Sequence, residues 1–181
     1  CRHKEKLKGI KSGICNGFWK MRIFLIRPPH LDLEYLPPTA VGIPLGMLSV
    51  AAYMEEQGHE VQVFDSLGYP DESEDKTHFG ASIERIDKAI KDFKPGIIGI
   101  TNLFSTQMKK ALSVTEHIKS IYPDAKIVVG GPHATAKPEE FLESSGIDIV
   151  VVGEGEFTLN SVADCYNGKK RISEVSGIAY I

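Results

Sequence analysis

Cysteine is scarce in this sequence, and its placement argues against two kinds of small-domain scaffold. The 181 residues include three cysteines, Cys1, Cys15 and Cys165, and none forms a CxxC pair. An odd number of widely spaced cysteines favours neither a disulfide framework nor a structural zinc site, so we expect a reducing, cytoplasmic setting. Long apolar runs are also missing, because none approaches the roughly 18 residues of a membrane-spanning helix. We therefore expect no membrane partner.

Excess positive charge is confined to the first residues of the chain. The formal net charge is −3, but residues 1–20 hold six Lys or Arg and one Glu, which leaves −8 for residues 21–181. An acidic body of this kind gives no support to a nucleic-acid partner. Because Met21 opens the first strand-like run, we interpret residues 1–20 as a basic extension, flexible or artefactual, and exclude it from the fold.

The rest of the sequence alternates short apolar runs with segments of helical periodicity. Strands are expected at 22–29, 59–65, 96–101, 125–131 and 148–152, and helices at about 44–58, 83–93, 107–121, 138–143 and 157–166. Continuous apolar strands that alternate with helices are typical of a parallel sheet covered on both faces. We predict an α/β, flavodoxin-like (Rossmann-like) fold, a doubly wound five-stranded parallel sheet with helices on both faces. Residues 176–181 read as one further strand-like run.

The first predicted helix carries an apolar pattern that we assign to the core. Leu45, Leu48, Ala52 and Met54 recur near helical spacing and are expected to face the sheet. Gly58 follows as a C-terminal stop. This helix should therefore bury one apolar stripe and expose its polar side.

The carboxyl ends of the strands in such a sheet share one edge, and ligands bind at that edge. This rule places His30, Thr101, Gly130 and Gly153 on one rim. A glycine can bring the backbone close to a bulky ligand, although Gly130 and Gly131 could equally do no more than turn a strand into a loop.

Small hydroxyl side chains follow the third predicted strand. Thr101, Ser105 and Thr106 can hydrogen-bond a ligand amide, phosphate or ring nitrogen. Ser105 or Thr106 can also cap the helix that comes next. The sequence supports both roles.

Several familiar site patterns are missing. There is no HxH or HExxH spacing, so we predict no protein-bound metal site. Residues 153–156 read GEGE rather than GxGxxG, and an acidic loop repels a pyrophosphate. A phospho-receiver domain needs an acidic pair after the first strand, where Pro28 and Pro29 stand.

Five segments together resemble a known family. They are Pro28–Pro29 after the first strand, the helix–strand unit at 44–65, GITNLFSTQ at 99–107, VVGGPHAT at 128–135 and DIVVVGEGEFTL at 148–159. As a set they resemble the cobalamin-binding domain that precedes the radical S-adenosylmethionine domain in cobalamin-dependent radical enzymes. The resemblance covers residues 21–167. It implies a cobalamin-binding domain at 21–168, with 169–181 as the start of a linker or strand towards a C-terminal radical domain.

The resemblance also implies the positions of cofactor contacts. The corrin ring would lie across the strand ends, with the nucleotide tail beside the first and third strands. The cofactor-binding residues expected from it are Pro29, Thr101, Asn102, Ser105, Thr106, Gly130, Gly131, Pro132, His133, Gly153, Glu154 and Gly155. No catalytic residue is expected within the chain.

Two departures from related patterns qualify this expectation. The DxHxxG motif, whose histidine ligates cobalt in some cobalamin domains, is absent, because Pro28 stands two residues before His30 and Leu33 three after it. We therefore predict cobalamin without histidine ligation. The CxxxCxxC motif of a [4Fe–4S] cluster is also absent, so the cluster and S-adenosylmethionine would belong to a C-terminal domain of a longer methyltransferase-like enzyme.

Two other functions are compatible with the same residues. The domain could dock a neighbouring domain without binding any cofactor. It could also be a stand-alone α/β enzyme that acts on a phosphate or sugar ligand, although no nucleophile–base set or phosphate loop is recognisable.

Overall fold

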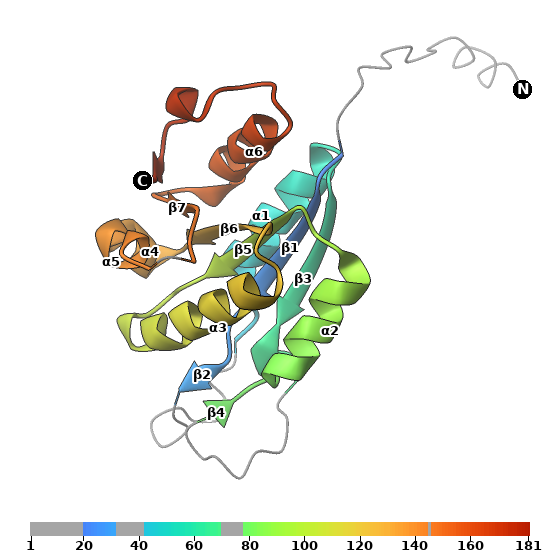
Figure 1. The fold of residues 1–181 in the computed structure, drawn as a ribbon, viewed down its shortest axis with the longest axis vertical. Helices are drawn as coiled ribbons and strands as arrows, with labels where there is room; N and C mark the ends of the chain where they lie inside the picture. The colour runs from blue at the N-terminus through green and yellow to red at the C-terminus, as the bar shows by residue number, and fades with distance from the viewer. Residues whose placement is uncertain (1–19, 32–41, 70–77, 145) are drawn as a thin grey trace, which may run out of the picture.

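The computed structural model describes residues 20–31, 42–69, 78–144 and 146–181, and residues 1–19 of the predicted extension 1–20 lie outside them. Six strands form one sheet in the order β3-β1-β5-β6-β7-β8 (Figure 1). They are β1 Arg22–Arg27, β3 Glu60–Asp65, β5 Ile97–Thr101, β6 Lys126–Gly130, β7 Ile149–Val151 and β8 Ile178–Ala179. All neighbouring pairs up to β7 are parallel, which confirms the predicted parallel sheet.

The sheet has one strand more than predicted. Strand β8 pairs antiparallel with β7, with Val150 opposite Ala179 and Val151 opposite Ile178. The chain reverses through the 3₁₀ turn Ile172–Glu174 and returns along the outer edge of β7. The count of five was therefore wrong for the sheet as a whole, although five strands are parallel as expected.

Helices connect the strands in the predicted order. They are α1 Leu45–Glu56, α2 Ile83–Phe93, α3 Met108–Ile121, α4 Pro132–Ala136, α5 Pro138–Leu142 and α6 Gly155–Tyr166. A 3₁₀ turn, Ser105–Gln107, precedes α3, and a short antiparallel pair joins β2 His30–Leu31 to β4 His78–Phe79. Helix α4 was not predicted. Its five residues begin at a proline, which suits the first helical position, but they are too few to show a periodicity.

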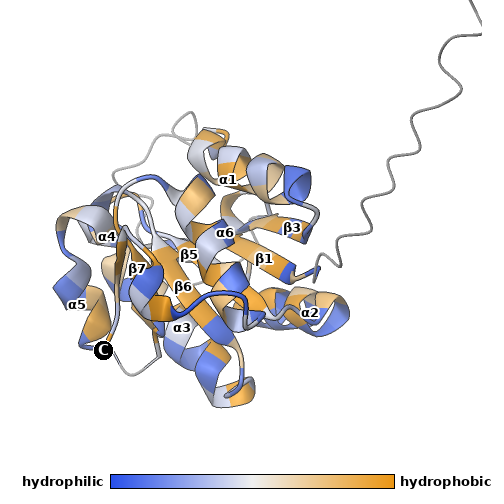
Figure 2. Ribbon diagram, turned by 90° about the horizontal axis from the view of Figure 1, so that it is seen from above, coloured by the Kyte–Doolittle hydropathy of each residue, from blue (hydrophilic) through white to orange (hydrophobic). Residues whose placement is uncertain are grey.

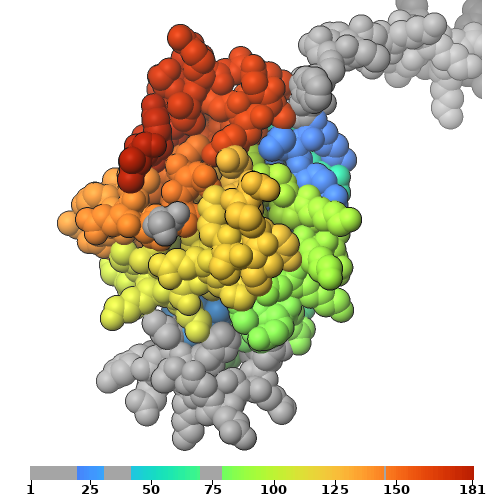
Figure 3. Space-filling model, in the orientation of Figure 1, coloured from blue at the N-terminus to red at the C-terminus, as the bar shows by residue number. Residues whose placement is uncertain are grey.

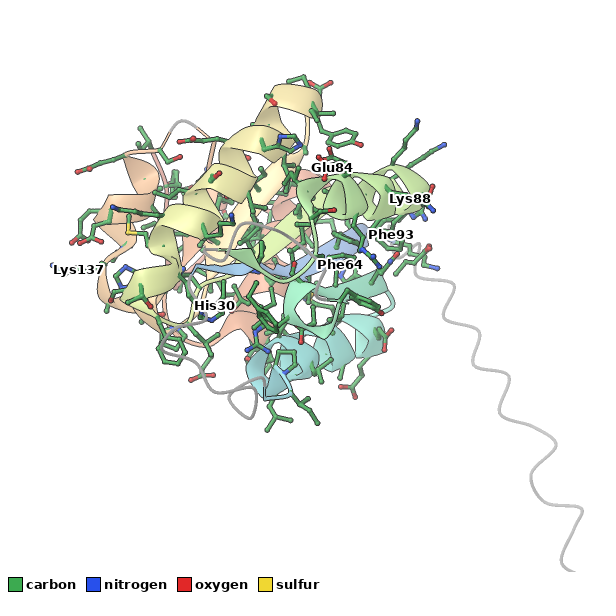
Figure 4. All side chains as sticks on the ribbon, turned by 90° about the horizontal axis from the view of Figure 1, so that it is seen from below. His30, Phe64, Glu84, Lys88, Phe93 and Lys137 are labelled. Atoms are coloured by element: carbon green, nitrogen blue, oxygen red, sulfur yellow. The ribbon has the colours of Figure 1, made fainter. Side chains whose placement is uncertain are left out.

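Two hydrophobic cores cover the two faces of the sheet, and α1 lies on the opposite side of the strands from α2 and α3 (Figure 2). On one face Phe24 packs its ring 6.0 Å from Phe64 and 5.8 Å from Phe93, measured between ring centroids. Phe64 and Phe93 are labelled in Figure 4, and the space-filling view in Figure 3 shows α2 and α3 side by side over this face. The other core is formed with α1 and α6.

The face that α1 buries differs in part from the prediction, because only Met54 of the four expected side chains is buried. Leu45 is 73% exposed and Leu48 is 38% exposed, and Ala52 is exposed as well. The buried side chains of this helix are Met47, Ala51 and Met54. Because α1 is apolar on both sides, spacing alone did not decide which side meets the sheet. The exposed side of α1 starts with Leu45, which lies near the carboxyl ends of the strands.

A half-buried polar contact joins α3 to the start of β6 and to the residue before β7. The carboxylate of Asp148 accepts the backbone N–H of Ile127 at 2.8 Å and lies 2.9 Å from Lys119 Nζ.

Burial, followed by the charges of Asp148 and Cys165, raises the pKa of Tyr166 to about 12. The fold therefore favours the neutral phenol of Tyr166.

This shift predicts a pH dependence of stability. The phenol of an unfolded tyrosine ionises near pH 10, so the contribution of Tyr166 is fully present below about pH 10 and is lost as the pH rises towards about 12. In Tyr166→Phe the fall in the free energy of unfolding over this range should be shallower than in the wild type. Urea titrations at a series of pH values measure it, and parallel pH profiles for the two proteins would contradict the assignment.

Candidate functional site

A cavity of about 740 Å³ opens at the carboxyl edge of the sheet, on the face that α1 and α6 cover. Its floor is made by alternate strand residues, and its walls by the first turns of two helices. The apolar side chains that line it include Leu25, Met47, Val50, Val128, Val151 and Leu159. Its volume and apolar lining are typical of a pocket for a small organic molecule.

Gly99 lies in the middle of the pocket floor. A Cβ atom at this position would stand 2.6 Å from Leu25 Cδ2, closer than real side chains approach. Its neighbours Ile98 and Ile100 point to the opposite face and are buried there. The absence of a side chain at Gly99 therefore leaves room for the side chain of Leu25 over β5 and for space in the pocket above it.

The ends of β5 and β6 are tied together by backbone contacts at the mouth of the pocket. Asn102 donates its N–H to the carbonyl of Gly130 at 2.8 Å, and the N–H of His133 bonds Asn102 O at 3.3 Å. Gly131 has a φ of +112°, and a Cβ there would lie 2.5 Å from Asn102 O. A glycine is therefore required at 131, where β6 turns into α4.

Two neighbouring glycines give a matched test of this constraint. Gly131→Ala forces Cβ into the Asn102 backbone at a φ that alanine disfavours, and it should lower the free energy of unfolding by about 1–3 kcal/mol. Gly130→Ala places its Cβ 3.7 Å from Val151 Cβ, an ordinary contact, and should change the stability by less than about 1 kcal/mol. Urea denaturation measures both, and equal losses would contradict the proposed contact.

The other side of the mouth is the loop that leads into α6. Gly153 has a φ of +90° and donates its N–H to Thr135 Oγ1 at 3.0 Å. Ser49 of α1 donates to Glu156 Oε1 at 2.6 Å, which joins α1 to the first turn of α6. The loop is therefore held from two sides while its own backbone stays exposed.

The structure brings together seven of the twelve cofactor contacts expected from the sequence. Those that line the pocket are Thr101, Gly130, Gly131, Pro132, Gly153, Glu154 and Gly155. They come from the ends of β5, β6 and β7, as the shared carboxyl edge predicts.

The other five expected contacts lie beside the pocket rather than in its lining. Asn102 is fully buried, and its amide can donate to Phe104 O at 3.2 Å and accept from Met108 N at 3.3 Å, which caps α3. Pro29 is buried and would lie 2.9 Å from a Cβ at Gly80. The contact role of these residues stays a prediction.

Three of those five are on the outer rim. Thr106 is exposed in the turn before α3. Ser105 Oγ lies 3.2 Å from His133 Nδ1, and His133 Nε2 lies 3.5 Å from Glu140 Oε2. The ring of His133 also packs edge-on against Phe141. His133 is thus hydrogen-bonded through Nδ1, while its buried Nε2 has no hydrogen-bond partner among the described residues, and its contact with a cofactor likewise stays a prediction.

The placement of His30 on the pocket rim was wrong. His30 is buried in β2, opposite Phe79 of β4, and its Nε2 contacts the Gln107 amide beside the start of α3 (Figure 4). Burial, followed by the nearby charge of Arg27, lowers the pKa of His30. The antiparallel β2–β4 pair, which the sequence did not predict, carries this side chain away from the pocket.

Several lining residues were missed from the sequence. The segment before and at the start of α1 forms one wall, through Gly42, Ile43, Pro44, Leu45, Gly46 and Met47. Arg27 holds it in place, since its Nη1 donates to Gly42 O at 2.7 Å and lies 3.3 Å from Asp65 Oδ2. The exposed apolar side chain of Leu45, at the start of α1, is the sequence signal for this wall.

Neither a membrane-spanning helix nor a metal site is present in the described ranges. Between residue 20 and residue 181, with the gaps given above, no helix is long and apolar enough to span a membrane. The same ranges hold no group of three or more His, Cys, Asp or Glu side chains arranged to bind a metal ion.

Comparison with known families matches most of this chain to one domain family. The model described as the B12-binding domain matches residues 38–163, which is more than half of the chain. The chain belongs to the B12-binding domain family. The resemblance found in the sequence is therefore confirmed for this domain.

Two curated relatives of this B12-binding domain are methyltransferases. Cytidylyl-2-hydroxyethylphosphonate methyltransferase of Streptomyces wedmorensis is 33% identical over 166 residues, which are 88% of this chain and 31% of that protein. An uncharacterised methyltransferase of Pyrococcus horikoshii is 34% identical over 161 residues, which are 88% of this chain and 32% of that protein. The chain thus spans about a third of the length of these relatives.

A solved structure shares the fold of this B12-binding domain. The cobalamin-dependent S-adenosylmethionine radical enzyme OxsB, with aqua-cobalamin and S-adenosylmethionine bound, superposes with a TM-score of 0.73 at 22% identity. The match covers 91% of this chain and 21% of that one. At this identity the likeness shows the fold alone.

Proposed function

We propose that this domain binds cobalamin at the pocket between the sheet and α1. The observation that carries the proposal is an apolar pocket whose opening is lined by the backbone of glycine residues. Leu25, Val128 and Val151 would hold the flat base of the nucleotide tail, with Gly99 leaving room for it. Gly130–Gly131 and Gly153–Gly155 would lie against the corrin and its side-chain amides.

The pocket also supports binding without a histidine ligand to cobalt. Among the described lining residues none is a histidine, and His30 is engaged with Gln107 away from the lining. His133 stands next to the lining residue Pro132, but its two ring nitrogens face Ser105 and Glu140. The lower face of the cobalt would therefore meet protein atoms other than imidazole.

The domain would serve a larger enzyme, in which a C-terminal radical domain holds S-adenosylmethionine and a [4Fe–4S] cluster. When bound, cobalamin supplies a methyl group for transfer to a substrate. The residues of this chain orient the cofactor and exclude water from its tail. Support comes from the methyltransferase relatives, of which this chain matches about a third.

Retention of hydroxocobalamin tests the proposal. The domain, incubated with excess cofactor and passed through gel filtration, should carry the corrin absorption band in its own peak at about one cofactor per chain. Elution without the band would contradict cobalamin binding and favour a docking module without cofactor.

A pocket-filling variant locates the site. Residue 130 faces the same side of β6 as Val128, so the ring in Gly130→Phe should enter the pocket and weaken hydroxocobalamin binding at least about tenfold. Ala52→Phe, which adds the same ring to the exposed side of α1, is the matched control and should bind like the wild type. Circular dichroism checks that both are folded. Equal affinities would place the site elsewhere.

Spectroscopy tests the prediction that no histidine is bonded to cobalt. Electron paramagnetic resonance of the reduced Co(II) cofactor on the protein should lack the nitrogen splitting that an axial imidazole or the tail base produces. A nitrogen splitting that disappears in His133→Ala or His30→Ala would contradict binding without histidine.

A further inference from the structure

Thr135 occupies a position that joins the two backbone loops of the pocket. It lies in α4, and its N–H donates to the carbonyl of Gly131 at 2.9 Å. Its hydroxyl oxygen accepts the N–H of Gly153 at 3.0 Å. One residue therefore fixes the spacing between the glycine turn after β6 and the glycine turn after β7.

The hydroxyl of Thr135 still has a proton to donate. A hydroxyl group has one donor and two acceptor sites, and the Gly153 N–H uses an acceptor site. Within the described part of the chain no acceptor takes the proton, in contrast to Thr115, whose hydroxyl donates to Ala111 O at 2.8 Å. Thr135 lines the pocket.

The oxygen of Thr135 is also held in a fixed place. A β-branched side chain has few χ1 rotamers in a helix, and the bond from Gly153 selects one of them. Because the oxygen accepts from Gly153 on one side, its proton must point elsewhere. The hydroxyl is thus preorganised as a donor at the pocket mouth.

We infer that Thr135 is a cofactor-binding residue that donates a hydrogen bond to an oxygen of the ligand while it holds the Gly153 loop. The inference rests on the proposed function. The acceptor chemistry, an oxygen with a free lone pair, exists in two parts of cobalamin. These are the amide carbonyls of the corrin ring and the oxygens of the nucleotide loop, which belong to its phosphate and its ribose.

Three variants separate this role from packing. Thr135→Val keeps the size and removes the hydroxyl, so the dissociation constant for hydroxocobalamin should rise roughly threefold to tenfold, as expected for the loss of one hydrogen bond. Thr135→Ser keeps the donor and should stay within about twofold of the wild type. Thr158→Val, on α6 outside the pocket lining, should not change binding.

Cobinamide, which lacks the nucleotide loop, identifies the acceptor. Weaker binding of both cobalamin and cobinamide to Thr135→Val assigns it to a corrin amide. Weaker binding of cobalamin alone assigns it to the nucleotide loop. Gly153 is exposed, so water can replace the lost partner of its N–H, and the thermal midpoint of the unliganded Thr135→Val should stay close to the wild type.

Two results would overturn the inference. One is wild-type affinity in Thr135→Val, and the other is an equal loss in Thr135→Val and Thr135→Ser, which would point to packing of the methyl group. If the wild-type domain itself does not bind hydroxocobalamin, the proposed function fails instead, so the two failures are distinguishable.

Discussion

The close approach of Gly131 to the backbone of Asn102 is the contact on which the site depends. It fastens the end of β6 to the end of β5 at a point where any side chain would meet the Asn102 carbonyl at 2.5 Å. Directly after this contact the chain enters the short helix α4. That helix places Thr135 beside Gly153 and defines the mouth of the pocket.

The two faces of the sheet differ in packing, because only the face covered by α1 and α6 carries the described pocket. On one face α2, α3 and α5 cover the strands with aromatic and branched side chains. On the other face α1 and α6 pack over the lower part of the strands, and the cavity opens where the first turns of both helices meet the strand ends. Gly99 and the glycines of the mouth replace side chains there, so the space is suited to an inserted ring system.

The sequence predicted the features that follow from continuous apolar strands. The parallel sheet, its shared carboxyl edge and the clustering of Thr101, Gly130 and Gly153 were all recoverable, because strand ends in such a fold converge. The wall made by α1 was not, since a helix that is apolar on both sides gives no single periodic face. Thr135 was missed as a site residue because its role depends on a hydrogen bond across 18 residues of sequence.

A crystal structure of the domain with hydroxocobalamin tests the central claim most directly. The account predicts density for the nucleotide tail between the strand floor at Gly99 and Val128 and the wall at Met47, and no histidine nitrogen bonded to cobalt. A cofactor that keeps its own base on cobalt and leaves this pocket empty would contradict the account.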